Sequence, residues 1–366
     1  MKELLARRAA LEGRIKELTT VPMVYAGKFV EKPEPTHRLH RGDPMQEREV
    51  VEPGVLGVVP ARFALRDAPT DDQKRRLALA QWIADPANPL PARVMVNRLW
   101  QYHFGEGLVS TPSDFGKKGA LPSHPELLDW LAAEFVHPTL SDERSAKRRE
   151  ASRPWSLKHI HRLIVTSAAY RQASAARPEC LSADAASRLL WRFPPQRLEA
   201  EVLRDTILAV SGKLDLRAGG PGFSAFEPND NYVRVYNPKR EFGPPEWRRM
   251  VYMTKVRMQQ DATFGAFDCP DGGQIAPKRM RSTTPLQALN LLNSGFVLQQ
   301  ADFFASRLEH EAGKDPKAQV RLAFELAYNR LPAREEAEAA RALIKQEGLM
   351  LFCRALFNSN EFIFVE

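Results

Sequence analysis

Five polar residues between positions 97 and 124 form the densest group of chemically useful side chains in this sequence. They are Asn97, Arg98, His103, Asp114 and His124. Two imidazoles and a carboxylate can bind a metal ion such as zinc or iron, or supply a general base with an orienting partner. We therefore treat His103, Asp114 and His124 as candidate catalytic residues, and Asn97 and Arg98 as candidate ligand-binding residues.

The same residues also have a structural interpretation, which we favour. His103 continues the apolar face of a predicted helix, His124 lies in the first turn of the next helix, and Asp114 caps a loop. A polar binding pocket is the second interpretation and a metal site the third, so we assign no metal ligands. The sequence does not show whether these side chains converge in space.

A second group consists of Arg197, Glu201, Arg204 and Asp205. Their spacings of three and four residues, within a predicted helix, favour an ion network on the helix surface. Alternatively, Arg197, Glu201 and Arg204 bind an anionic sugar or a sulfate group, because a guanidinium offers a two-pronged set of donors. His159 and His161 lie two apart on a predicted helix, point to different faces and are expected to be structural.

Common catalytic and cofactor motifs are absent from the sequence. It contains no Gly-x-Ser-x-Gly elbow and no His-Glu-x-x-His pair. Gly219-Gly-Pro-Gly222 lacks the Lys-Ser/Thr ending of a phosphate-binding loop. The three cysteines include no Cys-x-x-Cys pair, which excludes a haem attachment motif and a zinc knuckle. We predict no cofactor for this chain, and whether it is an enzyme stays open.

The charge balance permits an anionic partner but does not identify one. The 53 basic and 45 acidic residues give a formal net charge of +8, which suits nucleic acid, acidic polysaccharide or a membrane surface. The densest basic run, Lys147-Arg-Arg149, has Asp142, Glu143 and Glu150 beside it and is expected to be solvated surface. No nucleic-acid-binding motif accompanies the charge, so that class is the weaker alternative.

No targeting or membrane-spanning segment is predicted. Residues 1–18 are rich in Arg, Lys and Glu and lack the apolar stretch of a secretory signal. No run approaches the ~18 apolar residues that a transmembrane helix needs.

The capping and periodicity patterns predict a mainly α fold. It is an irregular multi-helix body with a small antiparallel β ribbon and long Pro-rich loops, consistent with 28 prolines in 366 residues. The ribbon pairs Tyr232–Tyr236 with Met250–Val256, and one or two edge strands lie within 21–63. Helices are expected over 2–18, 91–104, 155–170, 195–211, 316–329, 333–346 and 348–358, and from the capping boxes Thr70–Gln73, Ser123–Glu126 and Thr284–Gln287, with a break near 293–295.

These elements divide the chain into four segments. Residues 1–66 form an N-terminal helix and extended segment, and 67–215 form a helical domain. Residues 216–281 form a small β-containing segment, and 282–366 form a C-terminal helical region that packs on the body.

Several long sequence motifs occur in the order typical of one bacterial family. They are Arg76-Leu-Ala-Leu-Ala-Gln-Trp82, Ala92-Arg-Val-Met-Val-Asn-Arg-Leu-Trp100, Thr111-Pro-Ser-Asp-Phe-Gly116, Ser123-His-Pro-Glu-Leu-Leu-Asp-Trp-Leu131, His161-Arg-Leu-Ile-Val-Thr-Ser-Ala-Ala-Tyr-Arg171, Ser282-Thr-Thr-Pro-Leu-Gln-Ala-Leu-Asn290 and Asn358-Ser-Asn-Glu-Phe362. Over about residues 20–366 the sequence resembles the family called domain of unknown function 1553, typical of planctomycetes.

The resemblance implies a setting rather than a mechanism. Members usually form the C-terminal part of larger exported proteins, behind a companion domain and often a cytochrome c domain, and are often encoded near sulfatases. The resemblance therefore implies a periplasmic or cell-envelope location, an upstream cytochrome c domain and companion domain as partners, and anionic polysaccharide as a ligand. The family has no established catalytic residues to carry over.

Two functional hypotheses follow. The first is an accessory or binding module of an exported, cytochrome-c-linked assembly, associated with the use of sulfated polysaccharide. The alternative is a carbohydrate-active enzyme, hydrolytic or redox, that uses a His/Asp/Arg pocket in the region of His103, Asp114 and His124, with Arg98.

Overall fold

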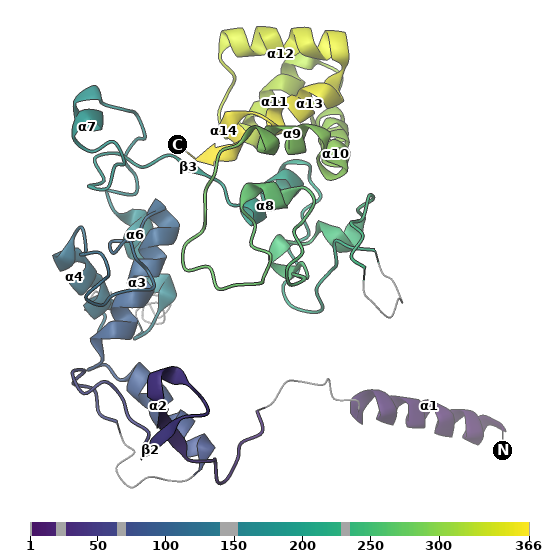
Figure 1. The fold of residues 1–366 in the computed structure, drawn as a ribbon. Helices are drawn as coiled ribbons and strands as arrows, with labels where there is room; N and C mark the ends of the chain where they lie inside the picture. Colours follow the sequence, from purple (N-terminus) through teal and green to yellow (C-terminus); the bar gives the residue numbers. More distant parts are fainter. Residues whose placement is uncertain (1, 20–26, 64–70, 140–152, 228–234, 366) are drawn as a thin grey trace. The chain divides into compact units, whose positions relative to one another are not determined.

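The structure is a computed structural model that describes residues 2–19, 27–63, 71–139, 153–227 and 235–365 (Figure 1). Contacts between residues divide the chain into two units, Met1–Arg93 and Val94–Glu366. The two units differ from the four segments expected from the sequence, and that finer division stays a prediction.

The first unit contains two helices and a β-hairpin. Helix α1 (Lys2–Thr19) leaves its apolar side chains from Leu4 to Leu18 exposed. Strands β1 (Thr36–Leu39) and β2 (Glu47–Val51) pair antiparallel around a single 3-10 turn, η1 (His40–Gly42). This hairpin confirms the strands expected within 21–63, although Met23-Val-Tyr25 lies outside the described residues and Val55–Val59 forms no strand.

Helix α2 (Asp72–Ala84) begins and ends through side-chain hydrogen bonds. The Asp71 carboxylate accepts from the Gln73 N–H at 2.8 Å, so Asp71 is the N-cap. The predicted cap, Thr70, lies outside the described residues. The helix stops before Asp85-Pro86, and the Asp85 carboxylate accepts from the Arg62 and Ala87 N–H groups.

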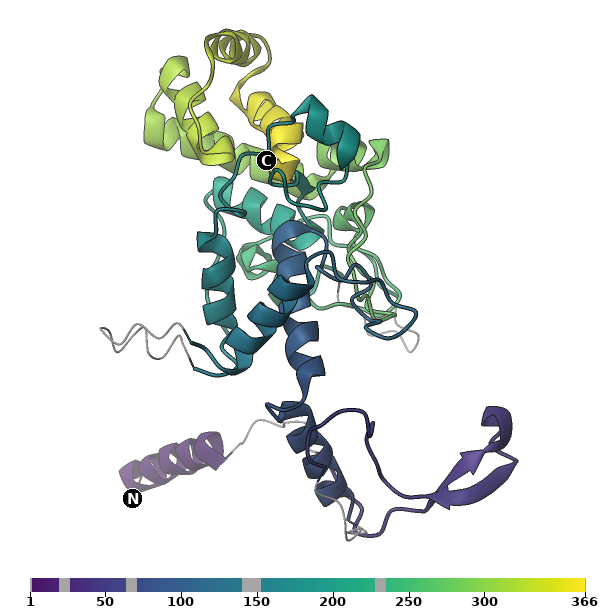
Figure 2. The ribbon, with the colours of Figure 1, turned by 90° about the vertical axis from the view of Figure 1, so that its left-hand side faces the viewer.

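The second unit begins with helices that carry the family-like motifs. Helix α3 (Pro89–Phe104) buries Val96, Leu99 and Trp100 and ends at Gly105, whose φ of +82° suits glycine. Figure 2 shows this helix in blue, with α4 and α6 packed against each other in the same unit. The helices that follow α3 are α4 (Pro125–Val136), α6 (Leu157–Thr166) and α7 (Pro178–Ala183).

Two of these helices have different ends from those predicted. Ser156 caps α6 as expected, but the helix ends at Thr166 rather than near Tyr170, because the Ser167 hydroxyl donates to the Ile164 carbonyl and accepts from the Tyr170 N–H. The predicted capping box at Ser123 is wrong. Helix α4 starts one residue later, with His124 at the N-cap and no side-chain cap.

The prediction of a helix over 195–211 is wrong at its start. Gln196 and Arg197 form a short strand, β3, that pairs antiparallel with β4 (Phe364–Val365), and helix α8 runs only from Ala200 to Val210. Pro194 and Pro195 precede this strand, and a residue before proline disfavours helical backbone angles. Arg197 therefore does not share a helix with Glu201 and Arg204.

The ribbon predicted within 216–281 is also wrong in the described residues. They form single 3-10 turns and isolated bridges, while Tyr232 and Val233 lie outside them. Met250 and Met253 are buried and Val251 is exposed, which is the three-residue period of a 3-10 turn rather than the two-residue period of a strand. The turns are η2 (Pro244–Trp247), η3 (Met250–Tyr252) and η4 (Phe264–Phe267).

The C-terminal helices form a bundle around the largest core of the unit. Thr284 precedes α9 at the N-cap and the helices break between Asn293 and Gly295, both as predicted. Helix α10 packs on α13, where Phe304 stacks on Phe357 (5.6 Å between ring centroids). Figure 1 shows the bundle in green and yellow. Its helices are α9 (Pro285–Asn293), α10 (Gly295–Ala312), α11 (Pro316–Tyr328), α12 (Arg334–Glu347), α13 (Leu349–Phe357) and α14 (Asn360–Ile363).

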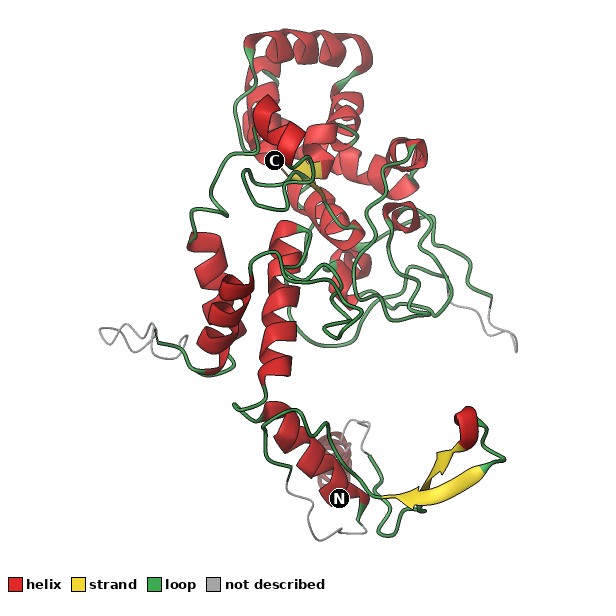
Figure 3. Cartoon of the chain, turned by 60° about the vertical axis from the view of Figure 1, so that its left-hand side comes forward, coloured by secondary structure: helices red, strands yellow, loops and turns green. Residues whose placement is uncertain are grey.

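Helices dominate the described chain, and short two-stranded sheets are its only β structure (Figure 3). The mainly α prediction is confirmed, although the β-hairpin lies at 36–51 and not within 216–281. Over the described ranges, no helix has the length and apolar character to cross a bilayer.

Arg204 anchors the irregular chain between α8 and α9. Its side chain is buried and donates to the backbone carbonyls of Glu246 and, at 2.9 Å, Arg248. Burial lowers the pKa of Arg204 to about 10, so the guanidinium stays charged at neutral pH. The chain around η2 and η3 thus obtains from one side chain the hydrogen bonds that it lacks from a sheet.

We predict that Arg204→Met lowers the free energy of unfolding by about 2–5 kcal/mol, because it leaves two buried carbonyls without donors. Urea denaturation followed by circular dichroism measures the change. Arg217→Met is the control, since Arg217 is 79% exposed and its loss should cost less than about 1 kcal/mol. Equal midpoints for the Arg204 variant and the wild type would contradict the anchoring role.

A second prediction concerns Glu336, at the start of α12. Hydrogen bonds from Arg330 lower its pKa from 4.5 to about 2. This contribution to stability is present above pH 4.5 and is lost as the pH falls towards 2. Both side chains are more than one third exposed, so solvent screening limits the contribution to about 0.5–1 kcal/mol.

Glu336→Gln should therefore be less stable than the wild type at pH 7 and nearly as stable at pH 2.5, by thermal unfolding at both values. Glu338→Gln, in the more exposed pair with Arg334, should show a smaller pH-dependent difference. A gap between Glu336→Gln and wild type that is the same at both pH values would be inconsistent with the ion pair as its cause.

Candidate functional site

Asn97 holds a loop in place. Its side-chain amide donates to the Val109 carbonyl at 3.0 Å and accepts from the Val109 N–H at 2.8 Å. A Cβ on Gly107 would approach the same amide to 2.8 Å, so the loop needs glycine there. The nitrogen and the oxygen of the Asn97 side-chain amide are thus both hydrogen-bonded to Val109. Arg98 is half-buried and makes no hydrogen bond or ion pair with a described residue.

Asp114 and His124 have separate local partners. The Asp114 carboxylate accepts from the Gly116 N–H at 2.8 Å, within a turn that the Thr111 hydroxyl closes on the Asp114 carbonyl. The His124 ring contacts the neighbouring Ser123 hydroxyl at 3.0 Å. Among the residues that the structure describes, no three His, Cys, Asp or Glu side chains gather in a group suited to a metal ion.

His103 instead meets His161. Their Nε2 and Nδ1 atoms lie 2.8 Å apart, and the edge of Tyr170 packs against the His103 ring at 5.4 Å. Burial and the neighbouring His161 lower the pKa of His103, so a neutral imidazole is favoured there. His159 points elsewhere and pairs with the buried Glu134 at 3.1 Å, which confirms that the two α6 histidines occupy different faces.

The predicted ion network of Arg197, Glu201, Arg204 and Asp205 forms only in part. Arg204 lies 3.9 Å from Asp205, whereas Arg197 and Glu201 have their partners elsewhere in the fold. Arg197 pairs with Asp268 at 2.6 Å. Glu201 pairs with Arg279 at 2.8 Å, and Arg204 donates to backbone carbonyls as described above. The three side chains do not form one ligand clamp.

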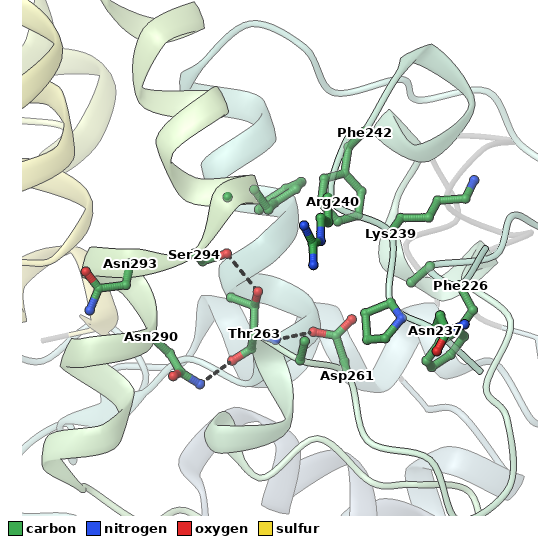
Figure 4. Close-up of a pocket in the computed structure, with 15 residues that line it drawn as sticks. Phe226, Asn237, Lys239, Arg240, Phe242, Asp261, Thr263, Asn290, Asn293 and Ser294 are labelled. Carbon is green, nitrogen blue, oxygen red and sulfur yellow. Dashed lines mark hydrogen bonds between the residues drawn. The ribbon is translucent and has the colours of Figure 1, made fainter. Parts of the chain in front are cut away.

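A cavity of the second unit lies at the junction of α9 and α10 (Figure 4). It has a volume of about 740 Å³. The chain around 237–242 forms one wall, and the residues ahead of η4 form another. Its polar lining residues are Asn237, Lys239, Arg240, Asp261, Thr263, Asn290, Asn293 and Ser294.

Hydrogen bonds fix one side of this cavity. One oxygen of the Asp261 carboxylate accepts from the Thr263 and Phe264 N–H groups, at 2.9 and 2.7 Å. The Thr263 and Ser294 hydroxyls lie 2.7 Å apart, and the Asn290 amide donates to the Thr263 carbonyl at 3.2 Å. The α9–α10 junction and the η4 loop are thereby joined, which positions their polar groups before any ligand arrives.

Other polar groups in the cavity are uncommitted. The side chains of Asn237, Arg240 and Asn293 make no hydrogen bond or ion pair with the residues that the structure describes. In Figure 4 the Arg240 guanidinium and the Asp261 carboxylate are directed towards the same space. Lys239, by contrast, is held by Glu246 at 2.7 Å, so Arg240 supplies the available positive charge.

Aromatic side chains form the apolar part of the lining. Phe242 packs edge-on against Phe296, with ring centroids 5.4 Å apart, and Phe264 supports Phe296 from behind at 5.7 Å. Phe226 adds a further ring. Small-ligand sites usually combine an aromatic or apolar wall with a limited number of fixed polar groups. The polar lining combines the Asp261 carboxylate and two basic side chains with amide and hydroxyl groups.

Sequence reasoning missed Arg240 and Asp261. Asn290 belongs to one of the family-like motifs, and Asn293 and Ser294 mark the predicted helix break, so the junction itself could be located from sequence. Arg240 and Asp261 stand in irregular chain without a periodic pattern, and only the three-dimensional structure brings them to the junction.

Comparisons with known proteins identify a family but no characterised relative. The chain matches no curated protein and no solved structure. Residues 75–344, well over half of the chain, match the family model PSD1, described as a protein of unknown function (DUF1553). The chain therefore belongs to the DUF1553 family.

Proposed function

We propose that this chain is a binding module for a polyhydroxylated ligand with an anionic substituent, of the sulfated or carboxylated saccharide type. The observation that carries the proposal is the cavity of about 740 Å³ in which Arg240 and two asparagine side chains are uncommitted. Side-chain amides both donate and accept, which matches the hydroxyl groups of a sugar. A guanidinium binds a sulfate or carboxylate through two parallel hydrogen bonds.

The other lining groups support the same ligand class. The free oxygen of Asp261 and the hydroxyls of Thr263 and Ser294 offer further partners for sugar hydroxyls. The rings of Phe226, Phe242 and Phe296 offer an apolar surface for the C–H face of a sugar ring. The proposal further includes an exported, cytochrome-c-linked assembly in the periplasm or cell envelope, on the strength of the family resemblance alone.

A carbohydrate-active enzyme remains the competing hypothesis. The residues on which it depended have no joint contact in the described chain; they are His103, Asp114, His124 and Arg98. A binding module needs no such convergence, and the cavity meets its requirements, so we favour binding.

We predict that Arg240→Gln weakens binding of a sulfated oligosaccharide at least about tenfold, because the ligand loses its charged donor pair, a loss of ~1.4 kcal/mol. Isothermal titration calorimetry with sulfated and desulfated forms of one oligosaccharide measures the effect. The desulfated form should bind the wild type and the variant with similar, lower affinity.

The matched control is Arg334→Gln, which removes one positive charge from a side chain that is 90% exposed and lies outside the cavity. It should leave the affinity for the sulfated ligand within about twofold, since a distant exposed charge is screened. If the control weakens binding as much as Arg240→Gln, attraction is non-specific, and if neither ligand form binds the wild type, the proposed function is wrong.

A further inference from the structure

A second, smaller cavity of the same unit lies beside the His103–His161 pair. It has a volume of about 260 Å³. Helix α3 contributes Tyr102 and His103, and the chain around β3 contributes Gln196, Arg197 and Glu199. Arg281, from the segment ahead of α9, completes the polar lining. None of these residues lines the cavity at the α9–α10 junction.

Two guanidinium groups, those of Arg197 and Arg281, line this cavity. Arg197 is 4% exposed, and the nearby charge of Arg281 adds to burial in lowering its pKa. Such proximity of two cations is unfavourable unless an anion lies between or beside them. The carboxylates around them therefore decide whether the site is already neutral.

The Asp268 carboxylate accepts hydrogen bonds from Arg197 and Ser282 and none from Arg281. It accepts from Arg197 at 2.6 Å and from the N–H and hydroxyl of Ser282 at 2.8 and 2.9 Å. Asp268 thus compensates Arg197 only. The Nε–H of Arg197 is nevertheless buried without a hydrogen-bond partner among the described residues, an unusual cost for a charged donor.

Arg281 has a long ion pair and donates no hydrogen bond to a carboxylate among the described residues. Its nearest acidic partner, Glu199, is 3.9 Å away, beyond hydrogen-bond distance. It donates instead to the neutral amide of Gln196 at 2.5 Å, and Gln196 is held in turn by the His103 carbonyl at 3.0 Å. By comparison, the neighbouring Arg279 has a full ion pair with Glu201 at 2.8 Å. Arg281 is therefore held in place and partly desolvated, and its hydrogen-bond donors are not occupied by a carboxylate of the described residues.

The backbone leaves room for this arrangement. A Cβ on Gly105 would lie 2.7 Å from a terminal nitrogen of Arg281 and 3.1 Å from the Gln196 amide oxygen. The end of α3 thus approaches the guanidinium as closely as a glycine allows. A fixed guanidinium next to polar side chains in a concave site is the arrangement that binds oxyanions.

We propose that this cavity binds a small oxyanion of the sulfate or phosphate type, with Arg281 as the principal ligand-binding residue. The anion accepts the hydrogen bonds that Glu199, at 3.9 Å, is too distant to accept. It is either a free ion or the terminal substituent of a larger molecule, and both present the same oxygen atoms to Arg281. The inference does not rest on the proposed saccharide function, because the two cavities have no residue in common.

The test is thermal unfolding of the full chain titrated with sodium sulfate or inorganic phosphate against sodium chloride at equal ionic strength. We expect a saturable rise in Tm of about 2–5 °C with sulfate or phosphate, because a ligand that binds only the folded state stabilises it. Arg281→Gln should abolish the rise, and Arg281→Lys should keep part of it, since lysine retains the charge without the planar fork. Arg334→Gln, the matched control, should respond like the wild type.

Circular dichroism of each variant without added anion shows whether the variant folds. If Arg281→Gln does not fold, the comparison of Arg281→Lys with the wild type tests the proposal instead. Repeating the titration with a monosaccharide sulfate distinguishes the two sources of the anion. If the monosaccharide sulfate half-saturates at a lower concentration than inorganic sulfate, the anion is a substituent of a larger molecule. If its half-saturating concentration is equal or higher, the anion is a free ion. The proposal is overturned if no saturable rise occurs, or if Arg281→Gln keeps the rise. Loss of the rise in Arg240→Gln but not in Arg281→Gln would place the anion in the other cavity and also overturn it.

Discussion

Buried arginines take the place of a β-sheet in the middle of the second unit. The chain from Lys213 to Arg281 is irregular in its described parts, so its carbonyls have few backbone donors. Arg204 donates to the carbonyls of Glu246 and Arg248, while the Arg248 side chain donates to those of Arg217, Gly219 and Pro221. Because a buried carbonyl without a partner is costly, these guanidinium groups decide which path the chain can follow.

Both candidate sites depend on this arrangement. In a sheet, the backbone N–H and C=O groups would pair with one another in a regular ladder. Here arginine side chains hold the irregular chain at a few carbonyls, and side chains such as Asn237 and Arg240 face a cavity. The same chain carries Asp268, which engages Arg197 and thereby brings β3 next to Arg281. Loss of an anchoring arginine should therefore disturb ligand binding as well as stability.

What could be predicted from the sequence follows from how local each interaction is. The caps at Ser156 and Thr284 and the break before Gly295 depend on neighbouring residues, and their positions were correct. The helical spacing of Arg197 and Glu201 led to a wrong prediction. Pro194 and Pro195 disfavour a helix there, and the strand that pairs with Arg197 lies near the C-terminus. The contact between His103 and His161 spans 58 residues and has no local signal.

The sites themselves could be predicted least, for a related physical reason. A functional arginine and a structural arginine have the same sequence signature, since both are single charged residues in irregular chain. They differ in whether a carboxylate or carbonyl already occupies the guanidinium, and that partner is usually distant, as Glu201 is for Arg279 or Asp268 for Arg197. Arg240 and Arg281 stand apart because each lines a hollow and donates no hydrogen bond to a carboxylate among the described residues. The net charge of +8 therefore matters less than the placement of these two cations, where desolvation strengthens their attraction for an anion.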